Sequence, residues 1–282
     1  ILNMDQISNI HVNLSNKVIN CDTIAFDKYN KDNWVYNKYN IAKLQGLDCN
    51  VMPIEPTNFP IILRPIINLY GMSKDTYKIT SLDNFHLHWG HQGFWCQYLE
   101  GIHRSIDCVI INNKIMWKCC FIGHKINNVI GGFDYWELDW SPLNSIIIAN
   151  INKIINKLTE YSGIMNFECI GNNIIECHLR PGDILFLDKS VIDQINNLYT
   201  LHTWNLQNYN NESIFLMPIW KQLMKTPELD VLNFIEKYHD KSIKYQISSE
   251  GLSGPPHFKR KCLLYHNNLQ NLLDFRKNIY KF

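Results

Sequence analysis

The sequence has little net charge and no long apolar segment. Its 282 residues carry a formal charge of +1, which gives no long-range attraction to nucleic acid or to an anionic membrane. No apolar run approaches the roughly 18 residues that a membrane-spanning helix needs, and the first ten residues lack the charged-then-apolar order of a signal peptide. We therefore expect neither nucleic acid nor a membrane among the partners.

The sequence also lacks paired cysteines. Its nine cysteines are an odd number, and none forms a Cys-x-x-Cys pair. Several fall at apolar positions of predicted strands, where a free cysteine behaves as a small hydrophobic side chain. This usage favours a reducing compartment such as the cytoplasm over a disulfide scaffold. The heavy use of Ile, Asn, Tyr and Lys is typical of an AT-rich coding sequence, such as that of a large virus or a parasite.

The hydrophobic content of 46% is sufficient for a sizeable core. Periodicity predicts strands over residues 17–26, 59–65, 77–80, 95–99, 103–112 and 114–123, and helices over 32–47, 144–161 and 190–201. The last part is expected to contain strands at 213–220, 243–248 and 260–266, a helix at 230–239 and a closing helix. Antiparallel hairpins mixed with helices indicate an α+β class rather than a doubly wound parallel sheet.

The most informative segment, residues 166–180, predicts a β-hairpin with one acidic face. Its turn is Gly171-Asn172-Asn173. A three-residue turn places Glu168 opposite Glu176, with their carboxylates about 5 Å apart. Strand alternation gives one polar and one apolar face. The polar face contains Asn166, Glu168, Glu176, His178 and Arg180, and the apolar face contains Phe167, Cys169, Ile175, Cys177 and Leu179.

Two carboxylates this close are unfavourable unless a cation lies between them. Hard oxygen ligands with an arginine beyond them suit Mg²⁺ bridging phosphates. The alternative interpretation is an ordinary amphipathic hairpin whose acidic face is solvated.

The order of these elements resembles the ATP-grasp superfamily, whose members clamp ATP between two α+β lobes and use it to activate a carboxylate. Four segments within residues 35–200 carry the resemblance through their order and spacing. They are Phe-Pro-Ile-Ile-Leu-Arg-Pro at 59–65, Tyr-Gly-Met-Ser-Lys at 70–74, Cys-Gln-Tyr-Leu-Glu-Gly-Ile-His-Arg-Ser-Ile-Asp at 96–107, and the hairpin at 166–180.

The resemblance implies a role for each matched position. Arg64 ends the strand that normally presents a Lys to the phosphates, and Lys74 lies in the loop that closes over them. Adenine is expected at the hinge, whose residues are Gln97, Tyr98 and Leu99, with His103 beside the nucleotide. Arg180, with Arg64, is the expected catalytic cation. The implied metal ligands are Glu168, Glu176 and His178, and the implied cofactors are ATP and Mg²⁺ or Mn²⁺.

The implied architecture has three parts: a remnant N-terminal lobe (1–34), an ATP-grasp-like nucleotide-binding and catalytic region (35–211) and a small C-terminal α/β extension (212–282). The implied reaction is ligation. ATP converts a small-molecule or peptide carboxylate into an acyl phosphate, which an amine or another nucleophile then attacks.

Two alternatives stay open. Arg64 replaces the usual Lys, Cys96 and His103 replace carboxylates, and His178 replaces an Asn. These departures favour a catalytically decayed nucleotide-binding or structural protein on the same scaffold, whereas the intact acidic hairpin favours an enzyme.

The second alternative is a zinc site, because residues 85–90 resemble the strand of α-type carbonic anhydrases that carries two zinc-binding histidines. On a strand, His86 and His88 would face the same side. His103 and His124 miss the spacing of the third ligand. Loop histidines near a cleft mouth are therefore the favoured interpretation.

Overall fold

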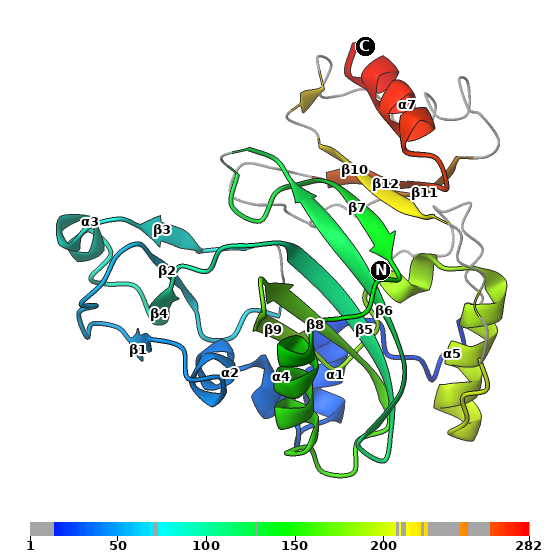
Figure 1. Cartoon of the computed structure of the whole chain (residues 1–282), viewed down its shortest axis with the longest axis horizontal. Helices are drawn as coiled ribbons and strands as arrows, with labels where there is room; N and C mark the ends of the chain where they lie inside the picture. The colour runs from blue at the N-terminus through cyan, green and yellow to red at the C-terminus, as the bar shows by residue number, and fades with distance from the viewer. Residues whose placement is uncertain are drawn as a thin grey trace.

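The computed structural model describes residues 14–69, 73–127, 129–206, 209, 213–220, 223–224, 243–247 and 260–281. Two antiparallel sheets organise this part of the chain (Figure 1). The small sheet consists of β1 (Cys49–Val51), β2 (Ile61–Pro65), β3 (Tyr77–Ile79) and β4 (Gly93–Gln97), in the order β1-β4-β2-β3. The predicted α+β class is confirmed.

The large sheet has eight strands. They are β5 (His103–Ile111), β6 (Lys114–Lys125), β7 (Phe133–Asp139), β8 (Gly163–Ile170), β9 (Asn173–His178), β10 (Phe215–Trp220), β11 (Lys244–Ile247) and β12 (Arg260–His266). Their order is β11-β12-β10-β7-β6-β5-β8-β9. Because β10 pairs with β7, the strands of the predicted C-terminal extension continue the same sheet as the predicted nucleotide-binding region.

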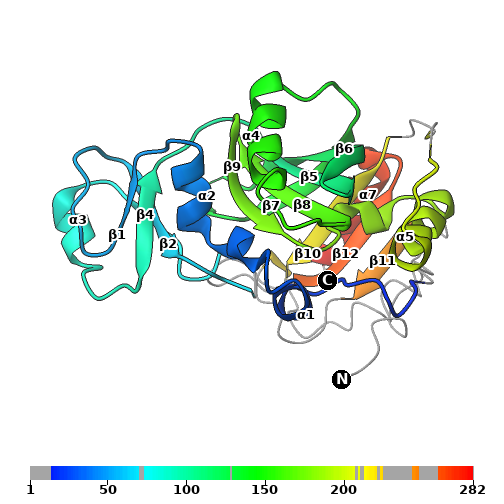
Figure 2. The ribbon, with the colours of Figure 1, turned by 90° about the horizontal axis from the view of Figure 1, so that it is seen from below.

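Helices cover the sheets and separate them. The described ones are α1 (Asp22–Lys28), η2 (Asn33–Tyr36), α2 (Lys38–Leu44), α3 (Leu82–His86), α4 (Ser145–Ile155), η3 (Asp183–Phe186), α5 (Lys189–Leu201) and α7 (Leu269–Lys281). None of these helices is long and apolar enough to cross a membrane. Figures 1 and 2 both place α2 between the two sheets, where it contacts β1, β4 and β9.

The large sheet has a buried apolar core on each face. On one face, Ile106, Cys108 and Phe167 pack beneath α4, η2 and α1. On the other face, the alternate residues Val109 and Ile164 pack with residues of α5, as the two-residue period of a strand requires.

The β8–β9 hairpin has the predicted pairing of Glu168 with Glu176, but its turn differs from the predicted three-residue turn. Its turn has two residues, so Ile170 pairs with Asn173, and a β-bulge then restores the pairing of Glu168 with Glu176. The extra residue changes the apolar face, because Ile174 is buried there beside Cys177, whereas Ile175, predicted on that face, is only half-buried. A bulge of this kind places two residues of one strand against one of its partner.

Three predicted elements differ from the structure. Residues 17–26 are not a strand, since they contain the start of α1, whose Ala25 is buried in the core. The predicted helix at 32–47 is divided at Asn37, which caps α2 by accepting from the Asn40 amide at 2.9 Å. His86 ends the helix α3, so the strand on which the carbonic anhydrase resemblance depends is absent there. The helix predicted at 230–239 lies outside the described residues.

The hairpin turn packs tightly against the connection between the two sheets. Gly171 has φ +59° and donates its amide to the Ile102 carbonyl at 3.0 Å. A Cβ atom at this position would lie 2.8 Å from the Glu100 carbonyl oxygen. Gly46 has φ +75°, and a Cβ atom there would meet no other atom within 4 Å. Both glycines have a positive φ, but only at Gly171 would a Cβ atom also overlap the main chain. Substitutions at the two positions therefore distinguish the two costs.

We expect Gly171→Ala to lower the free energy of unfolding by about 2–3 kcal/mol, because it adds overlap with the main chain to the roughly 1 kcal/mol cost of a positive φ. Gly46→Ala should show only the smaller cost. Urea unfolding of both variants checks this. Equal losses in the two variants would contradict the close approach at Gly171.

Candidate active site

The face of the large sheet beneath α5 changes from apolar to polar along its strands. Val109 and Ile164 belong to the apolar core at one end. Toward the other end, the register aligns buried or half-buried polar side chains across three adjacent strands. One row contains Asp107, Asn166 and His178, and the next contains Ser105, Glu168 and Glu176. The predicted polar face of the hairpin is therefore continued by β5.

Glu176 is paired with a lysine from another element. Lys38, the first residue of α2, places its Nζ 2.8 Å from Glu176 Oε1, and the two side chains are only 8% and 16% exposed. The backbone amide of Lys38 donates to the Ile66 carbonyl beyond β2. Lys38 thus links the small-sheet side of the molecule to β9.

Glu168 is paired with a histidine. His103 Nε2 lies 3.2 Å from Glu168 Oε2, and the His103 ring makes edge contacts with Phe133 and Trp136. Burial by itself raises the pKa of Glu168. The hydrogen bond and charge of His103, together with His178 and Lys38, outweigh that effect and lower the pKa to about 2. Glu168 is thus held as a carboxylate.

Asp22, at the start of α1, joins two of the predicted site residues. Its Oδ1 is 3.0 Å from His178 Nδ1, and Arg180 donates Nε and Nη2 to the same carboxylate at 3.0 and 2.9 Å. Burial opposes ionisation of Asp22, but His178 and Arg180 outweigh it and hold its pKa well below the usual range. Arg180 therefore makes a bidentate ion pair, and it also donates to the Pro181 carbonyl.

Asp107 receives main-chain donors from the segment after β9. The amides of Gly182 and Ile184 each donate to its carboxylate at 2.8 Å, and Asn166 Nδ2 lies 3.2 Å from Asp107 Oδ1. Burial raises the pKa of Asp107, and these hydrogen bonds act in the opposite direction. A Cβ atom at Gly182 would lie 2.5 Å from Asn166 Nδ2, so the close approach requires glycine.

Arg64 reaches from the small sheet to the large one. Its Nη2 donates to the Ile175 carbonyl at 2.9 Å, and its guanidinium lies 5.3 Å from the centre of the Phe94 ring. Its Nε is buried without a hydrogen-bond partner. Burial lowers the Arg64 pKa, while the charges of Glu176 and Glu168 raise it. The Arg64 guanidinium therefore interacts electrostatically with both facing carboxylates.

The other residues implied by the resemblance lie on the small-sheet side. Gln97 ends β4 and accepts from the Asp48 amide through Oε1 at 2.8 Å, while the Tyr98 ring lies 4.0 Å from Lys78 Nζ. Leu99, in the same connection, is half-buried, and Lys74 is exposed in the turn before β3. Residues 70–72 of the implied phosphate loop lie outside the described residues. The nucleotide-binding roles of these residues stay predictions.

The side chains at the implied metal site are poorly arranged as ligands of a divalent ion. Mg²⁺ prefers six oxygen ligands in octahedral geometry. The described residues contain no group of three or more His, Cys, Asp or Glu side chains arranged to hold a metal. Glu176 Oε1 faces Lys38 at 2.8 Å and His178 Nε2 at 3.7 Å, and Glu168 faces His103. The structure brings the three implied ligands together, but it gives each one a protein partner.

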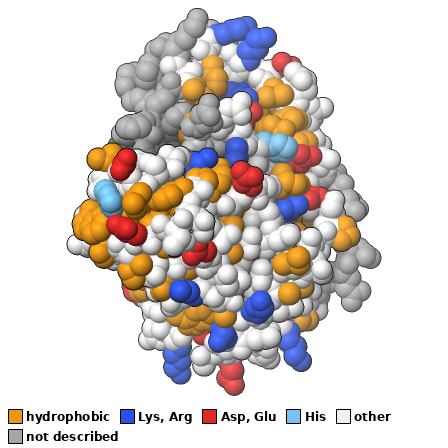
Figure 3. Space-filling view, turned by 60° about the vertical axis from the view of Figure 1, so that its left-hand side comes forward, with side chains coloured by type: hydrophobic (Ala, Val, Ile, Leu, Met, Phe, Trp, Pro, Cys, Tyr) orange, Lys and Arg blue, Asp and Glu red, His pale blue; other side chains and the backbone are white. Residues whose placement is uncertain are grey.

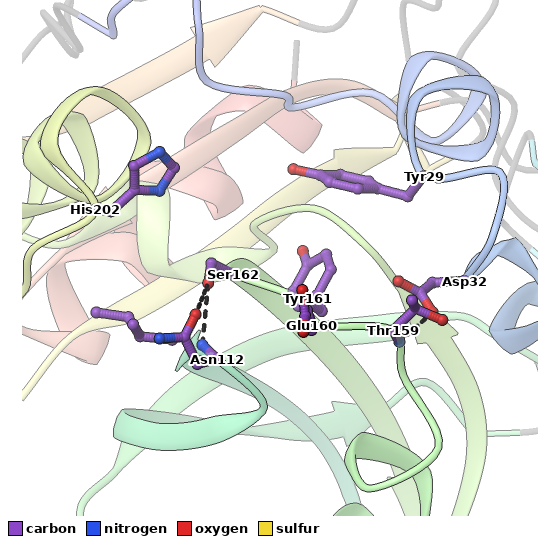
Figure 4. Close-up of a pocket in the computed structure, with 9 residues that line it drawn as sticks. Tyr29, Asp32, Asn112, Thr159, Glu160, Tyr161, Ser162 and His202 are labelled. Atoms are coloured by element: carbon purple, nitrogen blue, oxygen red, sulfur yellow. Dashed lines mark hydrogen bonds between the residues drawn. The ribbon is translucent and has the colours of Figure 1, made fainter.

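Figure 4 shows a separate pocket near the far ends of β5 and β8. Its lining includes Asn112, Ser162 and His202 together with Tyr29, Asp32, Ile111, Thr159, Glu160 and Tyr161. Asn112 and Ser162 already hydrogen-bond each other, and Asp32 accepts from the Thr159 amide at 2.7 Å. None of the residues implied by the ATP-grasp resemblance lines this pocket.

Charges are intermixed on the face that Figure 3 presents. Side chains of both signs occur on its coloured part, and Lys and Arg predominate toward the lower edge of the view.

No family model matches the sequence, and no curated protein matches it. Solved structures do. An L-amino acid ligase from Bacillus licheniformis aligns with a TM-score of 0.62 over 87% of this chain and 70% of its own, at 10% identity. The N5-carboxyaminoimidazole synthetase of Staphylococcus aureus aligns with a TM-score of 0.60 over 88% of this chain and 72% of its own, at 13% identity.

The chain has an ATP-grasp fold. A third ATP-grasp structure, carboxyaminoimidazole ribonucleotide synthase from Aspergillus clavatus, was solved with ATP. It aligns with a TM-score of 0.59 over 91% of this chain and 75% of its own, at 9% identity. The resemblance seen in the order of the sequence segments is thus confirmed at the level of the fold. At these identities the likeness concerns the fold alone.

Sequence reasoning missed Lys38 and Asp22. Both lie in short helices and meet β9 only through long-range packing. The wrong prediction of a strand at 17–26 also gave no reason to place Asp22 at the start of a helix facing β9. Asp107 and Ser105 had a usable signal, because they alternate with His103 along β5 and therefore share its face.

We expect acid to destabilise the protein through Glu168. Its pKa is lower in the folded state than the ordinary 4.5, so its stabilising contribution is complete above that value and is lost as the pH falls toward about 2. Glu168→Gln should flatten the fall in unfolding free energy between about pH 5 and pH 2. The exposed Glu160→Gln is the control. Equal slopes in Glu168→Gln and the wild type would contradict the His103 contact.

Proposed function

We propose that the chain binds ATP between its two sheets and acts as an ATP-dependent ligase for a carboxylate and an amine or other nucleophile. The observation that carries the proposal is the polar end of the large-sheet face, where Glu168 and Glu176 lie opposite each other. Arg64 approaches the same face from the small sheet. A packed sheet face normally buries apolar side chains, and this one does so only at its other end.

The proposed reaction has two steps. A carboxylate oxygen of the substrate attacks the γ-phosphorus of ATP, the bond to the ADP oxygen breaks, and an acyl phosphate and ADP form. The nucleophile then attacks the acyl carbon, phosphate leaves, and the nucleophile loses its proton. Positioning and electrostatic stabilisation supply most of the catalysis in phosphoryl transfer.

The residues of this chain would divide these tasks. Arg64 and Lys74 would steady the phosphates, and the main chain at 97–99 would hold adenine. Arg180, through its pairing with Asp22, would fix the end of β9 beside the reacting groups. We propose no step through a metal, because Glu168 already pairs with His103 and Glu176 with Lys38.

The second candidate is a nucleotide-binding protein that has lost catalysis on the same scaffold. The ion pair between Lys38 and Glu176 favours it, since it places a protein cation on one of the implied metal ligands. The two candidates differ in whether an acyl phosphate forms.

Hydroxylamine separates the candidates, because it converts an acyl phosphate into a stable hydroxamate. The full chain would be incubated with ATP, hydroxylamine and a panel of amino acids and dicarboxylates, with ADP and hydroxamate measured. A ligase should form both in equal amounts with at least one carboxylate. ATP binding without ADP or hydroxamate would instead support the decayed nucleotide-binding protein.

Arg64 provides a test of the binding site itself. We expect Arg64→Ala to weaken ATP binding by about 1.5–3 kcal/mol, the range for a hydrogen bond to a charged group, and Arg64→Lys to retain part of the affinity. Isothermal titration checks this. Arg276→Ala is the matched control, since that arginine pairs with Asp134 away from the site. An unchanged affinity in Arg64→Ala would remove Arg64 from the phosphate site.

A further inference from the structure

Three carboxylates at or beside the polar end of the sheet face already have side-chain partners within the protein. Glu176 pairs with Lys38 at 2.8 Å and Asp22 pairs with Arg180 at 2.9 Å. Glu168 faces His103 and interacts with Arg64. Glu168, Glu176 and Asp22 thus each have a protein side chain within ion-pair or hydrogen-bond distance, at the position that the resemblance assigns to a metal ion.

Lys38 occupies a defined position rather than a mobile one. Its side chain is 8% exposed, and its backbone amide is bonded to Ile66 while Asn37 caps the helix that begins with it. A Mg²⁺ ion bound to Glu176 Oε1 at about 2.1 Å would lie within about 5 Å of the Lys38 ammonium. The two cations would repel each other and share one carboxylate oxygen.

The Lys38 ammonium retains hydrogen-bonding capacity. An ammonium has three N–H donors, and the one side-chain partner of Lys38 among the described residues is Glu176. The remaining donors could serve phosphate oxygens, as lysine does in many phosphate sites.

We propose that Lys38 is the resident cation of this site, so that a nucleoside triphosphate binds here without a divalent ion and its phosphate oxygens accept from Lys38. The inference rests on the proposed nucleotide binding and concerns the cation that accompanies it. Lys38 takes the place that the ATP-grasp resemblance implies for Mg²⁺ or Mn²⁺.

The test measures binding of a non-hydrolysable ATP analogue by isothermal titration, with EDTA or with Mg²⁺. The wild type should bind with affinities that differ by less than about threefold, whereas Lys38→Met in EDTA should lose about tenfold or more, the lower end for a charge-assisted hydrogen bond. The control, Lys43→Met, removes an exposed lysine from the same helix and should leave both affinities unchanged.

Mn²⁺ alone supplies the second measurement, because electron paramagnetic resonance distinguishes free from bound Mn²⁺. The wild type should bind little Mn²⁺. Lys38→Met leaves Glu176 without its ammonium and should bind Mn²⁺ and regain part of its analogue affinity with it. The double variant K38M/E176Q removes both charges, which keeps the fold testable where the single variant is unstable, and it should show no such rescue.

The outcomes are distinct. Analogue binding to the wild type that requires Mg²⁺, or an unchanged affinity of Lys38→Met in EDTA, would overturn this inference and leave the proposed function intact. Rescue of the double variant by Mn²⁺ would also overturn it, because the metal would then bind elsewhere. No analogue binding by the wild type under any condition would overturn the proposed function, and this inference with it.

Discussion

The constraint on which the site depends is the pairing of Glu168 with Glu176 across the β8–β9 hairpin. Two facing carboxylates repel each other unless cations compensate them. The fold supplies partners for them from elements far apart in the sequence: the cations Lys38 from α2 and Arg64 from β2, and the ring nitrogen of His103 from β5. The position of α2 between the sheets thus has an electrostatic reason as well as a packing one.

The same sheet face combines two environments. Beneath α5 it is apolar, and a few residues further along each strand it holds a hydrogen-bonded network of ionised and polar groups. Low local polarity beside the network strengthens its ion pairs and raises the cost of leaving one group unpaired. Asp107, fixed by the amides of Gly182 and Ile184, lies between the two environments.

Much of the fold followed from local patterns. The two-residue period along residues 166–180 predicted the polar face and the pairing of Glu168 with Glu176. The bulge could not be predicted, because the same residues fit a two-residue or a three-residue turn. The strand expected at 17–26 was wrong because packing of α1 against the core overrides the β-propensity of Val18, Ile19 and Thr23. Lys38 has no local signal, since its partner is brought to it only by the tertiary fold.

The bond between Arg64 and the Ile175 carbonyl has a consequence for how this chain can diverge. Its acceptor is a main-chain atom, which every amino acid provides, so residue 175 is free to vary while the link between the sheets persists. Its donor is a side chain of particular length and shape. Substitutions at residue 175 therefore leave this hydrogen bond in place, whereas substitutions at Arg64 remove it. An alignment of diverged sequences would show the restriction only at position 64.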